Sequence, residues 1–166
     1  MAYVIALEDR RFFSHKGFDV YSIIRVFSFR LFGVKKGGAS TIGQQLARTI
    51  TNDREKKLSR KFREIILASQ IERKFTKLEL IGAYLNIAYF GSHLTGAIAF
   101  SKHFFKKDIY NLNDYELSIV AASLRYPCPK YPNKEWHEKI NRRAEYARQK
   151  ALQRNWIKKS SLIFQI

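Results

Sequence analysis

Apolar residues recur every three or four positions along most of this chain, and that spacing predicts a fold built from helices. The clearest case follows Asp19, which can cap a helix that Gly33 would end. The apolar face of this helix would hold Val20, Ile23, Ile24, Phe27 and Leu31. Further helices are expected after the capping residues Ser40 or Thr41, Thr76, Asn113 and Asn133. No segment of useful length alternates apolar and polar residues, so the chain is predicted to be mainly α, with no strand.

One of the predicted helices is long and basic, over residues 55–75. Its apolar face would hold Leu58, Phe62, Ile65, Ile66 and Ser69. Its opposite face would carry Lys56, Lys57, Arg60, Lys61 and Arg63. The next helix would run from Lys77 to about Tyr89 and stop at Gly91. Prolines 127, 129 and 132 predict an extended segment before a last helix that ends near Asn155.

Lys and Arg outnumber Asp and Glu by 31 to 14 in 166 residues, which gives a formal net charge of +17. The length fits one domain, and 46% hydrophobic residues are enough for one buried core. The single cysteine, Cys128, excludes an intramolecular disulfide and a cysteine-based zinc site. The charge predicts an anionic partner: nucleic acid, an anionic membrane or an anionic substrate.

The most apolar stretch, residues 20–34, is too short to span a membrane and is interrupted by Arg25 and Arg30. The residues before it do not show the pattern of a signal peptide, because no basic segment precedes the apolar residues 4–7. Two interpretations of this stretch stay open: a helix that lies at a membrane interface, or an amphipathic helix that faces the core.

Two short clusters near the start of the chain could carry chemistry. Glu8 follows an apolar run, where partial removal from water favours proton binding and suits acid–base work. The alternative is a helix-terminal Glu paired with Arg10 or Arg11, and His15 could equally be a structural histidine. In residues 37–45, glycines before a hydroxyl-capped helix leave backbone N–H groups that suit an anion, although an ordinary helix cap explains them too.

Two later clusters are ambiguous when each is taken alone. Glu64 lies among six basic residues and could help to manage a phosphate-rich ligand, provided that cations or a divalent metal lie between them. The alternative is a solvated helix face with pairs such as Arg60–Glu64. Lys77 stands near a helix N-terminus, where the helix dipole disfavours a cation, which hints at another role.

Taken in order, these clusters resemble the four motifs of the peptidoglycan glycosyltransferase (transglycosylase) domain of class A penicillin-binding proteins and monofunctional transglycosylases. The first motif is matched by Glu8, Asp9, Phe12, His15 and Gly17. The second is matched by Gly38, Ser40, Thr41, Gln44 and Gln45. The third is matched by Arg60, Lys61 and Glu64, and the fourth by Lys77, Ile81, Tyr84, Leu85 and Asn86.

The resemblance implies a lysozyme-like helical domain over residues 1–155, followed by an unassigned tail at 156–166. It implies an inverting hexosyltransferase of cell wall biosynthesis that polymerises lipid II and releases undecaprenyl diphosphate. Glu8 would be the general base, and Glu64 the second carboxylate near the diphosphate. The resemblance also implies a divalent cation, Mg or Mn, near Glu64 and no organic cofactor. The substrate-binding residues would be Asp9, Phe12, His15, Ser40, Thr41, Gln44, Gln45, Arg48, Arg54, Lys61, Arg63, Lys77 and Asn86.

The implied partners are lipid II, the growing glycan chain, a membrane surface and a transpeptidase that is fused or separate, with no nucleic acid. The implied location is the outer face of the bacterial cytoplasmic membrane, with the anchor missing from this sequence. Two features depart from the family pattern. Gly43 stands where a Thr is usual, and the fifth motif is met only by Arg143 and its neighbours.

Three other functions compete with this one. A lysozyme-type hydrolase would share the fold and a catalytic Glu, but it would not need cations around Glu64. A basic nucleic-acid-binding module would show steep salt dependence and would not need Glu8. A degenerate domain would bind substrate or membrane without turnover.

Overall fold

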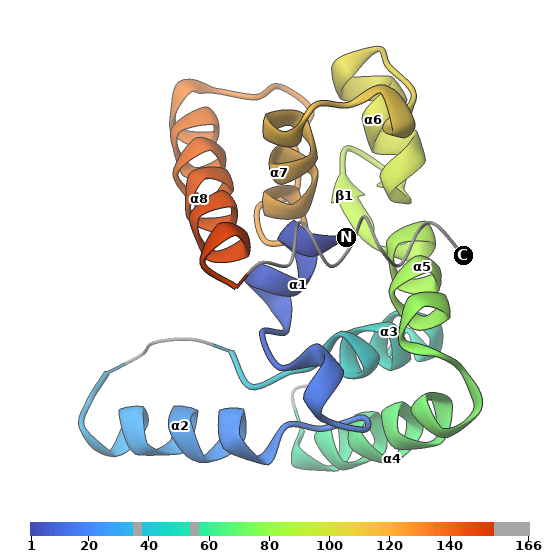
Figure 1. Cartoon of the computed structure of the whole chain (residues 1–166), viewed down its shortest axis with the longest axis vertical. Coiled ribbons are helices and arrows are strands. Elements are labelled where there is room, and N and C mark those ends of the chain that lie inside the picture. Colours follow the sequence, from blue (N-terminus) through green and yellow to red (C-terminus); the bar gives the residue numbers. More distant parts are fainter. Residues whose placement is uncertain (35–37, 54–56, 155–166) are drawn as a thin grey trace. The chain divides into compact units, whose positions relative to one another are not determined.

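The computed structural model describes residues 1–34, 38–53 and 57–154, which fall into two compact units (Figure 1). The first unit comprises Met1–Leu7 and the chain from Leu85 onward, and the second unit comprises Glu8–Tyr84. The boundaries between them fall inside two helices, α1 (Ala2–Glu8) and α5 (Lys77–Ile87). The domain end at residue 155 stays a prediction, because that position lies outside the described residues.

In the first unit, α7 (Asp114–Ser123) and α8 (Lys134–Gln153) lie side by side (Figure 1). Three of the residues that α8 buries are alanines, which let the two helices approach closely. The buried residues follow helical spacing: Trp136, Ile140, Ala144, Ala147 and Ala151. The capping box predicted at residues 113–116 is confirmed, since Asn113 and Glu116 satisfy each other's backbone N–H groups. Asn133 caps α8 by accepting from the N–H of Trp136, as predicted.

The first unit also contains a small hairpin that the sequence did not predict. Strands β1 (Tyr89–Gly91) and β2 (Leu94–Thr95) pair antiparallel, so the prediction of no strand was wrong. The preceding helix ends at Ile87 and not at Tyr89. Strands of two or three residues are too short to show an alternating pattern, which is why the sequence concealed them. Helix α6 (Ala97–Phe105) and the 3₁₀ turn η2 (Ile109–Asn111) follow.

The second unit contains the 3₁₀ turn η1 (Phe12–Ser14) and helices α2 (Val20–Leu31), α3 (Ile42–Thr51) and α4 (Leu58–Lys74), followed by most of α5. Helices α3 and α4 pack against each other (Figure 1). The core of this unit includes Phe12, Ile42, Leu46, Ala68, Leu80 and Ile81. Thr41 begins α3 by accepting a hydrogen bond from the N–H of Gln44 at 3.2 Å. Of the two residues considered for this cap, the structure therefore selects Thr41.

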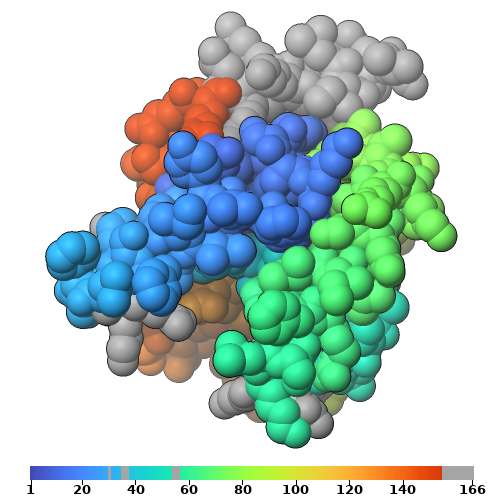
Figure 2. All heavy atoms as spheres, turned by 90° about the horizontal axis from the view of Figure 1, so that it is seen from below, coloured from blue at the N-terminus to red at the C-terminus, as the bar shows by residue number. Residues whose placement is uncertain are grey.

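Helix α2 confirms the predicted segment, and its apolar residues lie at the surface (Figure 2). Phe27 is 62% exposed and Leu31 is 70% exposed. The interpretation of α2 as a helix that faces the core is therefore wrong. In the described part of the chain, no helix is long and apolar enough to cross a membrane.

Helix α4 is turned differently from the prediction. Leu58, Phe62 and Ile66 are exposed, whereas Glu64 and Ala68 are buried. The predicted apolar face was wrong because three cations neutralise Glu64 and let it point inward toward α3. Helical periodicity identifies a face but does not say which face the rest of the chain covers.

Candidate active site

Glu8 ends α1 and lies beside the first turns of α3. The side-chain amide of Gln45 donates from Nε2 to Oε2 of Glu8 at 3.1 Å. The hydroxyl of Tyr84 donates to Oε1 of Gln45 at 2.8 Å, and this second hydrogen bond fixes the orientation of the Gln45 amide. Burial, followed by the charge of Glu8, raises the pKa of Tyr84 and keeps it a donor. Half-buried Glu8 is thereby held by a neutral amide of fixed orientation.

Asp9, the next residue, organises the start of α3. Oδ2 of Asp9 accepts the backbone N–H of Ile42 at 3.1 Å, a favourable position for a carboxylate at a helix N-terminus. Nε2 of His15 donates to the same carboxylate at 2.9 and 3.0 Å. Phe12 is buried nearby in η1, with the ammonium of Lys77 4.5 Å from its ring centroid. Three residues of the first motif, Asp9, Phe12 and His15, are therefore brought together as a scaffold beneath Glu8.

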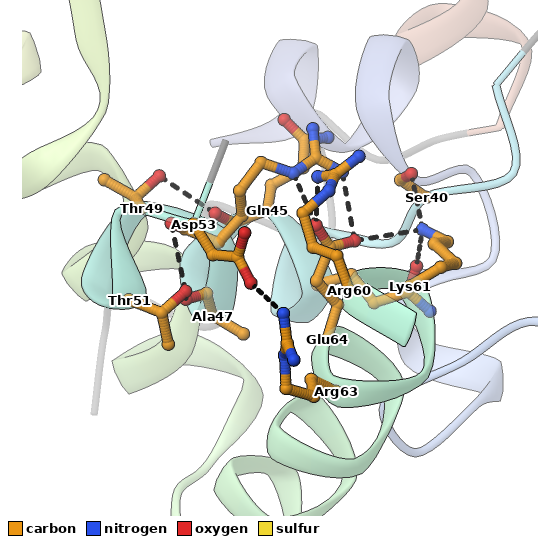
Figure 3. Close-up of polar contacts among 12 residues, drawn as sticks. Ser40, Gln45, Ala47, Thr49, Thr51, Asp53, Arg60, Lys61, Arg63 and Glu64 are labelled. Atoms are coloured by element: carbon orange, nitrogen blue, oxygen red, sulfur yellow. Dashed lines mark hydrogen bonds and ion pairs between the residues drawn. The ribbon is translucent and has the colours of Figure 1, made fainter. Parts of the chain in front are cut away.

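The second motif joins the η1 region to α3 and α4. The hydroxyl of Thr41 and the amide of Gln44 both donate to the carbonyl of Gly17. The ammonium of Lys61 then donates to Ser40 Oγ at 2.9 Å and to Gln44 Oε1 at 2.5 Å (Figure 3). The predicted residues of the second and third motifs therefore meet through Lys61.

Glu64 lies at the centre of a cation cluster on α3 and α4 (Figure 3). Arg48 donates to both of its oxygens, from Nε at 2.7 Å and from Nη2 at 3.1 Å. Arg60 donates from Nη1 at 2.5 Å, and Lys61 lies 3.3 Å away. The pair Arg60–Glu64 was expected on a solvated face, but the Glu64 side chain is only 3% exposed. We call Arg48, Arg60, Lys61 and Glu64 the cation cluster.

The pKa values in this cluster follow from its charges. Burial alone would raise the pKa of Glu64, but the hydrogen bonds and charges of Arg48 and Lys61 outweigh burial and lower it. Burial lowers the pKa of Lys61, against the opposing effect of Glu64. The hydrogen bond to Glu64 raises the pKa of Arg48. Glu64 is therefore an ionised, weakly basic carboxylate, poorly suited to take a proton at neutral pH.

The arrangement around Glu64 does not fit a directly bound divalent metal. Both of its oxygens accept hydrogen bonds from cations, which would repel a metal ion. Over residues 1–34, 38–53 and 57–154, no group of three or more His, Cys, Asp or Glu side chains could hold a metal.

The other predicted site residues do not contact the cation cluster through a described hydrogen bond or ion pair, or lie outside the described residues of this unit. Arg63 pairs with Asp53 at 2.6 Å and is exposed, and Lys77 pairs with Glu72 at 2.6 Å. Arg54 lies outside the described residues. Asn86 and Arg143 belong to the first unit, and their part in this site stays a prediction.

The sequence motifs did not reveal two participants, Tyr84 and Glu72. Tyr84 lies in the fourth motif without a predicted role, and no motif includes Glu72. Glu72 was hidden because it sits in an ordinary charged stretch, Glu72-Arg73-Lys74, with nothing to mark it as buried. Its position opposite Gly43 becomes visible only when α3 and α4 are packed together.

The second unit thus contains a carboxylate, Glu8, that accepts from an amide, and a cation cluster around Glu64. Both are held by residues on neighbouring turns of α3. This arrangement suits the transfer of a group away from an anionic leaving group. A family model described as Transglycosylase matches residues 1–152, so the chain belongs to the transglycosylase family. The predicted family and the predicted mainly α fold are both confirmed.

Curated relatives agree with this membership. The biosynthetic peptidoglycan transglycosylase of Shewanella oneidensis is 35% identical over 156 residues, which cover 94% of this chain and 62% of that protein. Penicillin-binding protein 1F of Bacillus subtilis is 40% identical over 129 residues, and penicillin-binding protein 1A of Vibrio cholerae is 38% identical over 141 residues. These matches cover 77% and 84% of this chain, but only 18% and 17% of the two penicillin-binding proteins.

Proposed function

We propose that this chain polymerises lipid II into glycan strands, with inversion at the anomeric carbon and release of undecaprenyl diphosphate. The observation that carries the proposal is the face of α3 that bears both Gln45 and Arg48. Residues three apart are neighbours on a helix surface, about 5–6 Å apart at Cβ. Gln45 reaches Glu8, and Arg48 reaches Glu64. A candidate base and a diphosphate-binding cluster are therefore one helical turn apart.

Glu8 is the proposed general base. The acceptor 4-hydroxyl transfers its proton to the Glu8 carboxylate as the oxygen attacks the anomeric carbon of the donor. The new C–O bond forms while the bond to the diphosphate oxygen breaks, and the electron pair leaves with the diphosphate. A single displacement of this kind inverts the anomeric centre.

The cation cluster is proposed to stabilise the leaving group. Arg48, Arg60 and Lys61 together exceed the single charge of Glu64, so the cluster can attract a diphosphate and donate charge-assisted hydrogen bonds to it. Glu64 keeps the cations in place before the substrate arrives. Ser40 and Gln44 already contact Lys61 and are the proposed contacts to the sugar–diphosphate portion.

The test is incubation with lipid II and, separately, with preformed glycan. Polymerisation of lipid II without shortening of the glycan is the expected result. Shortening without polymerisation would establish a lysozyme-type hydrolase, and binding without either reaction would establish a degenerate domain. Parallel reactions with EDTA, Mg²⁺ and Mn²⁺ test the metal requirement. Because the cations occupy Glu64, we expect EDTA to leave the rate nearly unchanged.

We also propose that the apolar face of α2 lies at a membrane interface, on the outer face of the bacterial cytoplasmic membrane, where the lipid-linked substrate is found. Exposed Phe27 and Phe32 beside Arg25 support this, because such a face suits the boundary between head groups and acyl chains. Phe27→Glu and Phe32→Glu should reduce co-sedimentation with anionic liposomes. The control is Tyr110→Glu, which alters an exposed aromatic residue in the first unit. Unchanged co-sedimentation of the Phe variants would reject the proposal.

A further inference from the structure

Glu72 is a buried carboxylate to which the proposed mechanism gives no role. It lies on the last turns of α4 with a side chain only 1% exposed. Oε2 of Glu72 accepts from the ammonium of Lys77 at 2.6 Å and lies 3.9 Å from Nδ1 of His15. In the part of the chain that the structure describes, neither Oε1 of Glu72 nor Nδ1 of His15 has a hydrogen-bond partner. A buried carboxylate with an unsatisfied oxygen is costly, so its retention calls for an explanation.

Gly43 explains how Glu72 fits. Gly43 is the second residue of α3, and it faces Ala68 and Glu72 of α4. A Cβ at Gly43 would lie 2.8 Å from Oε1 of Glu72, closer than such atoms normally approach. Gly82 in α5 differs, because a Cβ there would meet nothing within 4 Å. The missing side chain at position 43 makes room for the carboxylate.

The contacts of Glu72 lead to Glu8 in a few steps. His15, beside Glu72, donates to Asp9, and Asp9 accepts the N–H of Ile42, the first residue of α3. Lys77, paired with Glu72, also lies over the ring of Phe12. Glu72 therefore pairs with Lys77 and lies beside His15, the residue that supports Asp9 at the first turn of α3. From the following turn, Gln45 reaches the carboxylate of Glu8.

We propose that Glu72 is a positioning residue for the transfer reaction and that Gly43 is the residue that admits it; this inference rests on the proposed function. Glu72 acts through His15 and Lys77 on the start of α3, and thereby on the direction in which Gln45 holds Glu8. Displacement of its carboxylate moves the base relative to the acceptor hydroxyl. The cation cluster, which binds the diphosphate, keeps its own contacts.

The test compares two glycine-to-alanine substitutions in helices. Gly43→Ala and Gly82→Ala both add one methyl group and both favour the helix. Gly43→Ala should lower kcat about tenfold, since small misplacements of catalytic groups are costly, while KM changes less than about twofold. Gly82→Ala should leave both constants unchanged. A merely structural role for Gly43 would give two variants that behave alike.

A double-mutant cycle shows whether Gly43 acts through Glu72. In a Glu72→Ala background the crowding disappears, so adding Gly43→Ala should cause little further loss of kcat. Independent losses that multiply would overturn the proposal. If Glu72→Ala does not fold, Glu72→Asp replaces it, because the shorter side chain also withdraws the carboxylate and should restore part of the rate of Gly43→Ala.

NMR of the side chains separates this inference from the proposed function, because it needs no turnover. Gly43→Ala should shift the ¹⁵N resonances of the His15 ring and of the Gln45 amide, and Gly82→Ala should not. If the wild type does not polymerise lipid II, the proposed function fails and these resonances alone decide: shifts support the positioning role, and unmoved resonances overturn it. If the wild type is active, an unchanged kcat in Gly43→Ala overturns it.

Discussion

Glu8 and Glu64, the two carboxylates with a proposed role in the reaction, accept hydrogen bonds from different kinds of donor. Glu8 receives a hydrogen bond from the neutral amide of Gln45, which Tyr84 fixes in turn. Glu64 receives hydrogen bonds from Arg48, Arg60 and Lys61. Both groups are attached to the same helix, α3, through residues one turn apart.

This difference shows how one helix, α3, can support two carboxylates with different chemical roles. Cations that hold an anionic group lower its pKa and spoil it as a base. The lowered pKa of Glu64 therefore favours charge balance as its role, and proton transfer is the role proposed for Glu8.

The largest expected effect comes from Glu8→Gln, which keeps the shape of the side chain but cannot take a proton. The rate of lipid II polymerisation should fall by about 10²–10⁴-fold, the usual contribution of a general base. Glu145→Gln on the exposed face of α8 is the control and should keep the wild-type rate. A Glu8→Gln variant with the wild-type rate would remove Glu8 as the base.

Glu64→Gln should reduce both stability and activity, because it leaves three cations without their carboxylate. Breaking a fully buried pair costs about 3–5 kcal/mol. Since Arg48 and Lys61 reach water, we expect a loss of about 2 kcal/mol in the free energy of unfolding, measured with urea. Glu135→Gln removes an exposed partner of Lys139 and should leave this free energy nearly unchanged. Equal effects of the two substitutions would contradict the buried role of Glu64.

Acid should destabilise the protein through the same cluster. The pKa of Glu64 lies below its ordinary value of 4.5 in the folded chain, so the unfolded chain takes up its proton first. Its contribution to stability is complete above pH 4.5 and is lost as the pH falls through the lower folded value. Asp19 behaves alike, because bonds from Ser22 and the charge of Arg11 outweigh burial and lower its pKa. Urea titrations between pH 6 and pH 3 should therefore show a shallower decline for Glu64→Gln than for the wild type, and parallel curves would contradict this.

The smallest expected effect concerns the helix caps. Thr41→Ala and Asn113→Ala each remove an N-cap and should cost about 1 kcal/mol in the free energy of unfolding. Only Thr41→Ala should also slow polymerisation, because α3 carries Gln45 and Arg48 whereas α7 lies in the other unit. A similar loss of rate in both variants would contradict the role of α3 as the helix that positions both Glu8 and Glu64.

The sequence predicted much of the fold because its signals were local. Capping residues at Thr41, Asn113 and Asn133 begin helices through contacts within one turn, and each prediction held. The exposed side of α4 could not be predicted in this way. Burial of Glu64 depends on Arg48, which is distant in sequence and reaches it only through tertiary packing.

In the candidate site too, local motifs could be predicted from the sequence, whereas contacts made by tertiary packing could not. The spaced motifs identified Glu8 and Glu64, but the contact between Gln45 and Tyr84 joins residues 39 positions apart. Lys77 was predicted to hold diphosphate, and the structure gives it Glu72 and the ring of Phe12 as neighbours. Glu72 itself carried no sequence signal, because its significance lies in the gap at Gly43 across the α3–α4 interface.

The most direct test of the division between the two carboxylates measures lipid II affinity and polymerisation rate on the same preparations of Glu8→Gln and Glu64→Gln. The account predicts that Glu8→Gln binds lipid II as the wild type does but does not polymerise it, whereas Glu64→Gln binds it more weakly. Loss of affinity in Glu8→Gln together with unchanged affinity in Glu64→Gln would contradict it.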